Sequence, residues 1–326
     1  AALKRLVTKP PKVAFLTGHG ERNVDGAGER DYGAFVRDLT FRYSLPNQGF
    51  DVTLLRLDEQ KNIPEDIDIL VIAEPRTVLA PEELTKIKEY IDRGGNMILS
   101  GEPYRQHIMN PLLSFLGLEF MPGILVQPSK DFTADLIFGN ITEAAAQSSK
   151  GYQKLWRGKY KITMPGAVGI KILEEKEFKV TPLVTTNEEG AWNELETTDF
   201  IDNQPIYNSQ VGEEERTIPV VVELTRRVGE KEQRIFVWGD ADCIGNGELT
   251  TSREGVRSSN FSLITNSFGD LSYGKFPVDT SRPRPSDDKA YIGEGSEIWL
   301  KLLFMGLLPG ILVFISLRMW WFRKSR

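Results

Sequence analysis

The 326-residue sequence predicts an α/β fold, with an open and mostly parallel sheet followed by one C-terminal membrane helix. Short apolar runs that alternate with stretches of helical periodicity predict the sheet, because such runs form buried parallel strands and helices connect them. An uncharged stretch over residues 302–317 predicts the membrane helix.

Four apolar runs in the first third of the chain are the expected parallel strands. They cover residues 13–17, 52–55, 67–73 and 97–100. One helix is expected between the first two, from the helical spacing of Tyr32, Phe35, Val36, Leu39 and Tyr43. Pro81 is expected to begin a second helix, since proline suits the first helical position. Residues 111–116 are expected to form a third helix. Right-handed crossovers then place the helices on the faces of the sheet.

The pattern changes over residues 119–232, where glycine, proline and charged turns separate short alternating runs. We expect a β-rich insertion there, which divides the α/β domain into residues 1–118 and 233–274. A hairpin of residues 218–224 and 234–238 is expected to return the chain to the main sheet.

The C-terminal segment, residues 297–323, is expected to span a bilayer once, after a proline-rich linker over residues 275–296. The expected anchor residues are Trp299, Pro309, Trp320, Trp321 and Arg323. Because cationic residues gather after the span, the positive-inside rule places the tail in the cytoplasm and the domain outside it. An exported domain needs an earlier signal, so we expect a further span upstream of Ala1.

Composition excludes several function classes. A formal net charge of −6 without a long basic stripe argues against a nucleic-acid partner, since Lys and Arg hold most phosphates. Cys243 is the single cysteine, so an intrachain disulfide and a cysteine-rich zinc site are both excluded. The chain has no G-x-x-x-x-G-K-[ST] motif, so we expect ATP hydrolysis in a partner and no cofactor here.

Charged and polar residues follow four of the expected parallel strands. Ligands of open parallel sheets bind outside the carboxyl ends of the strands, so these residues are expected to line one crevice. The candidate crevice residues are Thr17, His19, Glu21, Glu74, Arg76, Glu102, Asp240 and Asp242. The aromatic residues Trp156, Tyr160, Trp192 and Tyr207 offer a sugar- or peptide-binding face, although aromatic residues more often pack a core.

A metal site is one alternative for the same crevice. His19 and the neighbouring carboxylates have suitable donor atoms. Acidic residues at strand ends more often cap helices or form turns, so we predict no metal.

A thiol nucleophile is a second alternative, because ADCIG around Cys243 loosely resembles a nucleophile elbow. A catalytic thiolate needs a base, and both histidines, His19 and His107, lie far earlier in the chain. A buried, inert Cys243 is therefore the favoured interpretation, and no catalytic residue is predicted.

Several runs of the sequence resemble a known family. KVAFLTGHGE, DYGAFVRDL, DIDILVIAEPRTVLAPEEL, IDRGGNMILSGEP and RIFVWGDAD resemble the auxiliary proteins of ABC transporters typified by the gliding-motility protein GldG. The resemblance implies a flavodoxin-like, class I glutamine amidotransferase-like fold, related to a domain of intraflagellar-transport proteins and lacking the amidotransferase cysteine.

The resemblance also implies a role. It implies a non-catalytic, extracytoplasmic component in the inner membrane of a bacterium, with an ABC permease and a cytoplasmic ATPase as partners. A glycan, peptide or lipoprotein is the ligand class that the crevice would engage. A ligand- or glycan-binding receptor and a divergent thiol or metal hydrolase stay open as alternatives. Gly306 and Gly310 offer a small-residue strip to a permease helix.

Overall fold

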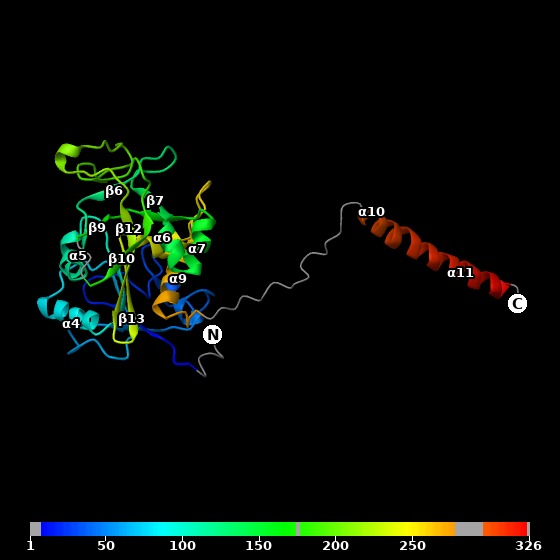
Figure 1. Cartoon of the computed structure of the whole chain (residues 1–326), viewed down its shortest axis with the longest axis horizontal. Coiled ribbons are helices and arrows are strands. Elements are labelled where there is room, and N and C mark those ends of the chain that lie inside the picture. Colours follow the sequence, from blue (N-terminus) through cyan, green and yellow to red (C-terminus); the bar gives the residue numbers. More distant parts are fainter. Residues whose placement is uncertain (1–7, 174–176, 278–295, 325–326) are drawn as a thin grey trace. The chain divides into compact units, whose positions relative to one another are not determined.

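A computed structural model describes residues 8–173, 177–277 and 296–324 (Figure 1). The chain divides into two compact units, Ala1–Asp279 and Thr280–Arg326. Most of the expected linker and the start of the chain at Ala1 lie outside the described residues.

A nine-stranded sheet forms the first unit, in the order β2-β1-β3-β4-β13-β12-β10-β7-β8. Its parallel strands are β2 (Asp51–Leu55), β1 (Lys12–Leu16), β3 (Ile69–Ala73), β4 (Asn96–Ser100) and β13 (Lys231–Trp238). Its antiparallel strands are β12 (Pro219–Val228), β10 (Lys179–Thr185), β7 (Leu136–Ile141) and β8 (Lys161–Pro165). The parallel part has the strand order of flavodoxin-like folds, so the predicted α/β class is confirmed.

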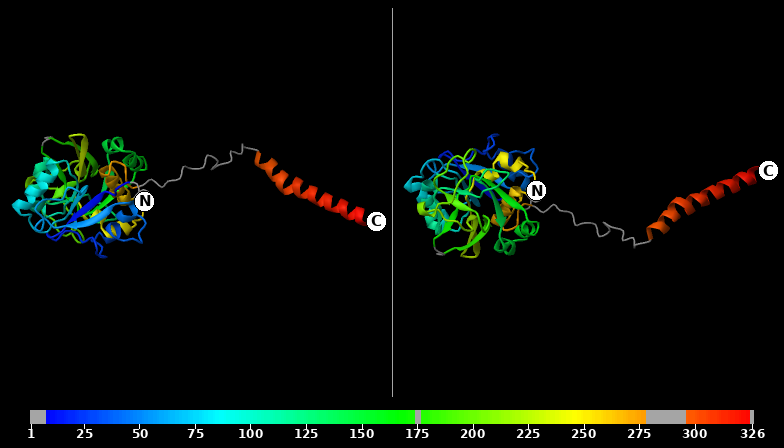
Figure 2. Two further views of the ribbon diagram at one scale, coloured as in Figure 1. Left: turned by 90° about the horizontal axis from the view of Figure 1, so that it is seen from below. Right: turned by 90° about the horizontal axis from the view of Figure 1, so that it is seen from above.

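Alternate residues of the buried strands face two separate cores. In β1, Val13 and Phe15 face one core, whereas Ala14 and Leu16 face the other. Helices α4 (Pro81–Asp92) and α5 (Gln106–Leu113) cover one face of the sheet, and α7 (Lys150–Arg157) and α9 (Asn260–Leu271) cover the other (Figures 1 and 2). The sheet is therefore buried on both faces, as its continuous apolar runs require.

Shorter elements connect these layers. They are α2 (Gly33–Val36), α3 (Leu45–Gln48), η1 (Ser114–Leu116), β5 (Leu118–Phe120), β6 (Ile124–Val126), α6 (Glu143–Ser148), β9 (Ile170–Ile172), β11 (Trp192–Glu194), η2 (Ser209–Val211), η3 (Asp242–Ile244) and α8 (Asn246–Thr250). Strand β6 pairs with β11, and β5 pairs with β9.

The β-rich residues 119–232 are built into the central sheet. Strands β7, β8, β10 and β12 come from this segment, and the predicted hairpin is formed by β12 and β13. The division of the domain at residues 118 and 232 stays a prediction.

The predicted helix between the first two strands is wrong. Two four-residue helices, α2 and α3, replace it, and Leu39 between them is 72% exposed. The Asp38 carboxylate accepts hydrogen bonds from the Thr40 backbone N–H and hydroxyl, both at 2.7 Å, which favours a turn there. Pro46 then suits the first turn of a new helix. The third predicted helix begins earlier than expected, at Gln106 of α5.

The described part of the second unit is one long, mostly apolar helix. It comprises α10 (Ser296–Lys301), a π-helical stretch over Leu302–Leu307 and α11 (Leu308–Lys324). Within the described ranges, Ile298–Lys324 is the one helix long and apolar enough to cross a membrane, and an 18-residue stretch of it has a mean hydropathy of 2.3. The five predicted anchor residues lie in it. The π-helical stretch ends two residues before Pro309, which has no N–H to donate within the helix.

Candidate functional site

The parallel strands β1, β3, β4 and β13 bring charged residues to one edge of the sheet. The loop after β1 supplies Arg22, β3 leads directly into Glu74, and Glu102 follows β4. Asp240 and Asp242 follow β13. Because the chain reverses its direction of progress between β1 and β3, this edge is the switch point at which α/β sheets bind ligands.

Arg22 lies at the centre of these carboxylates, and its side chain is 1% exposed. Its Nε is 2.6 Å from Glu74 Oε2, its Nη2 is 2.6 Å from Glu102 Oε1, and its Nη1 is 2.6 Å from Asp242 Oδ1. We call Arg22, Glu74, Glu102, Asp240 and Asp242 the Arg22 cluster. Each of the three nitrogens of the Arg22 guanidinium lies close to a different carboxylate, and the three carboxylates come from the ends of three strands.

Three further arginines surround the Arg22 cluster. Arg30 Nε lies 2.9 Å from Asp242 Oδ1, and Arg105 Nη1 lies 2.8 Å from Glu74 Oε1. Arg76 Nη2 is 3.7 Å from Glu74 Oε2, at the edge of the cluster. These cations offset the buried negative charge, which an isolated group of carboxylates would not tolerate.

Backbone N–H groups also bind the carboxylates. Glu102 Oε1 accepts hydrogen bonds from the backbone N–H of Ala241 at 3.1 Å and of Asp242 at 3.2 Å. Asp240 Oδ1 accepts one from the backbone N–H of Cys243 at 3.1 Å. The turn after β13 is thereby tied to the end of β4.

Two acids of the Arg22 cluster retain protons more strongly than usual. Burial, followed by the Asp242 carboxylate, raises the pKa of Glu102 to about 7, against the opposing effect of Arg22. Burial, followed by Glu102 and Asp242, raises the pKa of Asp240 well above its usual range. The cluster can therefore hold protons near neutral pH.

Cys243 lies next to the Arg22 cluster but has the surroundings of an inert thiol. It is fully buried, and its Sγ donates to the Asp240 backbone carbonyl at 3.1 Å. Burial, together with the carboxylates of Asp240 and Glu102, raises the pKa of the Cys243 thiol well above its usual range. These surroundings disfavour the thiolate that a nucleophile requires.

The histidines lie in other surroundings. His19 Nε2 is 2.9 Å from Glu83 Oε2, and His19 Nδ1 is 3.4 Å from Glu21 Oε1. Glu83 Oε2 also accepts a hydrogen bond from the Ala80 N–H at 2.8 Å, so this group fixes the first turn of α4. His107 is exposed on α5.

The predicted crevice residues therefore fall into two groups. Glu74, Glu102, Asp240 and Asp242 meet around Arg22, with Arg76 at the edge, whereas His19 and Glu21 meet Glu83. Thr17 belongs to the β1–β2 pair, since its N–H donates to Leu55 O at 2.9 Å. The sequence interpretation missed Arg22, Arg30 and Arg105. One available signal was electrostatic, because four acids at one sheet edge require nearby cations.

The Arg22 cluster contains donors of a type that binds metal ions. Oxygens of Glu102, Asp240 and Asp242 lie within 4.8 Å of one another. The Arg22 guanidinium, however, is already 2.6 Å from Glu102 and from Asp242. A metal ion held by these three acids would lie beside that positive charge, so the donor set does not fit a cation while Arg22 is in place.

A hollow of about 530 Å³ opens beside the Arg22 cluster. It is lined by Ala27, Glu29, Arg30, Pro165, Asp242, Asn246, Gly247, Glu248, Thr250, Thr251 and Arg253. Among the residues that the structure describes, its lining includes no aromatic side chain and carries both signs of charge. The inner crevice is filled by Arg22, and this outer hollow suits a polar ligand.

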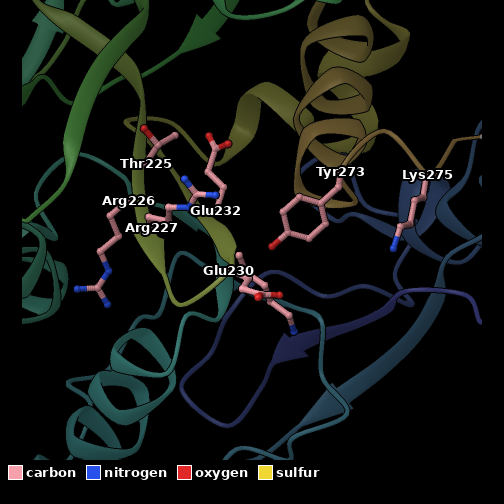
Figure 3. Close-up of a pocket in the computed structure, with 8 residues that line it drawn as sticks. Thr225, Arg226, Arg227, Glu230, Glu232, Tyr273 and Lys275 are labelled. Carbon is pink, nitrogen blue, oxygen red and sulfur yellow. The ribbon is translucent and has the colours of Figure 1, made fainter.

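A second hollow, of about 710 Å³, lies at the opposite edge of the sheet. Figure 3 shows Tyr273 reaching from the end of α9 toward the β12–β13 turn at Glu230. Arg226 turns away and donates to Ile91 O at 2.8 Å. The predicted crevice residues do not line this hollow.

The four predicted aromatic residues have different packing partners. The rings of Trp192 and Tyr207 meet at 6.0 Å in the β6–β11 region. Tyr160, which directly precedes β8, instead lies beneath the Arg257 guanidinium at 4.8 Å, and Trp156 is partly exposed on α7. The use of these residues as a sugar- or peptide-binding face stays a hypothesis.

The sequence of this chain matches one family model, and its structure resembles several solved structures. Residues 10–270 match the family model described as "ABC-type uncharacterized transport system". No curated protein matches the chain. The mmIFT52 N-terminal domain is similar in structure, with a TM-score of 0.55 and 13% identity over 81% of this chain and 98% of that domain. A ThuA-like protein from Bacteroides uniformis has a TM-score of 0.45 and 12% identity, over 81% of this chain and 93% of that one.

Proposed function

The chain belongs to the family of ABC-type uncharacterized transport systems. We propose that it is an auxiliary component that acts outside the cytoplasm and catalyses no reaction itself. Its proposed partners are an ABC permease and a cytoplasmic ATPase. It would bind the permease in the inner membrane of a bacterium. The runs that resemble GldG support a GldG-type component within the family. ATP hydrolysis is assigned to the ATPase, because this chain has no phosphate-binding G-x-x-x-x-G-K-[ST] motif.

The Arg22 cluster carries the non-catalytic part of the proposal. Enzymes of this fold class place reactive groups at the strand ends. Here the acids at those ends bind Arg22 and backbone N–H groups, and the Cys243 thiol is buried among carboxylates. The alternative of a thiol hydrolase predicts loss of turnover in Cys243→Ala, whereas our proposal predicts an unchanged transport phenotype.

The outer hollow favours a receptor as the second candidate function. Arg30, whose side chain is 52% exposed, and Asp242 line it beside the Arg22 cluster. A polar glycan or peptide that enters this hollow would meet both charges. Thr250→Trp would narrow the hollow and should lower transport without loss of the partner subunits. Unchanged transport in that variant would contradict a receptor role.

The apolar helix supports the proposed permease contact. Gly306 and Gly310 lie with Trp299, Leu303 and Phe314 along one strip of this helix. Small residues let a second helix approach closely in a bilayer, where packing stabilises association.

Co-purification from detergent-solubilised membranes tests this contact. Gly306→Leu with Gly310→Leu should weaken recovery of the permease and ATPase with the tagged full chain. Leu308→Phe with Leu312→Phe, which adds bulk outside the strip, is the matched control and should retain them. Absence of both subunits from the wild-type preparation would contradict the proposed partnership.

A further inference from the structure

Residues 188–216 form a lobe at one end of the first unit, which we call the acidic lobe. Figure 1 shows this yellow-green segment beyond β6, at the end of the unit opposite to the end of α9. Thr8 and Lys275, near the two ends of the described part of this unit, line one hollow with Leu271 at the end of α9. The lobe is therefore remote from Lys275, beyond which the sequence leads to the apolar helix.

The acidic lobe has an extreme charge for its size. It contains nine Asp or Glu residues and one basic residue, Arg216, so its formal charge is −8. The whole chain has a formal charge of −6, so all the other residues together carry +2. The net negative charge of this protein therefore comes from one short segment, although acidic residues also occur elsewhere.

Two buried glutamates give the acidic lobe its shape. Glu194 accepts hydrogen bonds from the N–H groups of Glu196 at 3.0 Å and Thr197 at 2.7 Å. Glu213 accepts from the N–H groups of Leu195 at 3.1 Å and Asn208 at 2.6 Å. Carboxylates buried in this way stabilise one loop conformation, because each would be costly without these donors.

Large apolar side chains project from this ordered loop. Ile201 is 84% exposed and Ile206 is 80% exposed, whereas Phe200 beneath them is buried with Trp192 in a small core. In the sequence, Asp199 and Asp202 flank Ile201. An apolar centre with a charged rim on a preorganised loop is the usual anatomy of a protein interface.

We infer that the acidic lobe docks a separate extracytoplasmic protein through a surface that carries basic residues around an apolar centre. Charge complementarity selects a basic partner, since a lobe of this charge repels acidic surfaces. The inference rests on the proposed location of the domain outside the cytoplasm.

The permease is a poor match for this partner. The positive-inside rule concentrates Lys and Arg in the cytoplasmic loops of membrane proteins, so short extracytoplasmic loops offer few cations. The lobe also lies at the end of the domain remote from Lys275, beyond which the sequence leads to the proposed membrane helix. Both observations favour a separate protein over the transport subunits.

Photo-crosslinking of the full chain in cells tests the inference. A photoreactive residue at Ile206 reports on the acidic lobe, and one at Val78, which is also exposed, serves as the positional control. We expect one adduct specific to Ile206, which mass spectrometry identifies as an extracytoplasmic protein with a basic surface.

Two matched sets of variants test the role of charge. Glu196→Gln, Asp199→Asn and Asp202→Asn together should reduce the adduct roughly tenfold, as expected for three exposed charge pairs. Glu89→Gln, Glu230→Gln and Glu254→Gln change the net charge equally outside the lobe and should leave the adduct unchanged.

Four outcomes would overturn the inference. They are an adduct no stronger at Ile206 than at Val78, an adduct with the permease, a partner with an acidic surface, and equal loss in both sets of variants. Co-purification of the permease and ATPase is measured on the same cells. Its failure would contradict the proposed function separately from the docking inference.

Discussion

Arg22 Nε and Glu74 Oε2 lie 2.6 Å apart, and both side chains are 1% exposed. This ion pair joins the loop after β1 to the end of β3 in the interior of the protein. A buried charge depends on its partners, because water no longer solvates it. The pair therefore holds together the edge of the sheet at which ligands of related folds bind.

Arg22→Met should destabilise the domain by about 3–5 kcal/mol, because it leaves several buried carboxylates without their common cation. Arg30→Met, in which the lost guanidinium is half exposed, should cost about 1 kcal/mol or less. Urea unfolding of the detergent-solubilised full chain, followed by circular dichroism, measures both. Equal losses of stability would show that Arg22 does not have this special role.

Glu102 should give stability a specific dependence on pH. Burial, with Asp242 second, raises its pKa from 4.5 to about 7, so the folded chain binds this proton more tightly than the unfolded chain does. Between pH 4.5 and about pH 7, the folded state therefore binds more protons than the unfolded state does. The contribution of Glu102 to the free energy of unfolding therefore falls as pH rises from about 4.5 to about 7.

Glu102→Gln removes that titration. The difference in free energy of unfolding between wild type and variant should change by up to about 3 kcal/mol across this window. Urea unfolding at several pH values measures it, and the subtraction removes the effect of acids that do not interact with Glu102. Parallel pH profiles for the two proteins would contradict the assignment.

The Cys243 thiol should be unreactive in the folded protein. It is fully buried, and neighbouring carboxylates, after burial itself, raise its pKa. Since Cys243 is the single cysteine, a maleimide should label the chain after denaturation and leave the native chain unlabelled. Rapid labelling of the native protein would restore a nucleophilic interpretation.

Glu213→Ala should loosen the acidic lobe while the central sheet stays intact. The change removes the acceptor of two backbone hydrogen bonds, from Leu195 and Asn208, each worth about 1.5–3 kcal/mol when the acceptor is charged. Limited proteolysis should then cut within the lobe. Glu214→Ala, at an exposed neighbouring position, is the control and should stay resistant. Equal protease resistance of the two variants would contradict the proposed anchoring role of Glu213.

The positions of several strands could be predicted, because a buried parallel strand appears in the sequence as a short continuous run of apolar residues. The run ILVIA of β3 and the hairpin β12–β13 are apolar, regular and bounded by turns. The helix predicted across Leu39 was wrong because helical spacing alone does not register the turn that Asp38 favours. Tertiary packing then left Leu39 exposed.

The carboxylates of the Arg22 cluster could be predicted from the rule that strand ends converge. Their common cation could not, since Arg22 lies in an irregular loop whose path depends on packing against β3. The grouping of His19 with Glu83 likewise depends on how α4 meets that loop. Such contacts join segments far apart in sequence and leave no local periodicity.

The location of the domain outside the cytoplasm is the central claim, and thiol labelling of intact cells tests it most directly. In a Cys243→Ala background, Asn203→Cys places a single thiol on the exposed acidic lobe, and Ser325→Cys places one after the span. We expect a membrane-impermeant maleimide to label Asn203→Cys in intact cells and to label Ser325→Cys after the membrane is disrupted. Labelling of Ser325→Cys in intact cells, with Asn203→Cys protected, would contradict it.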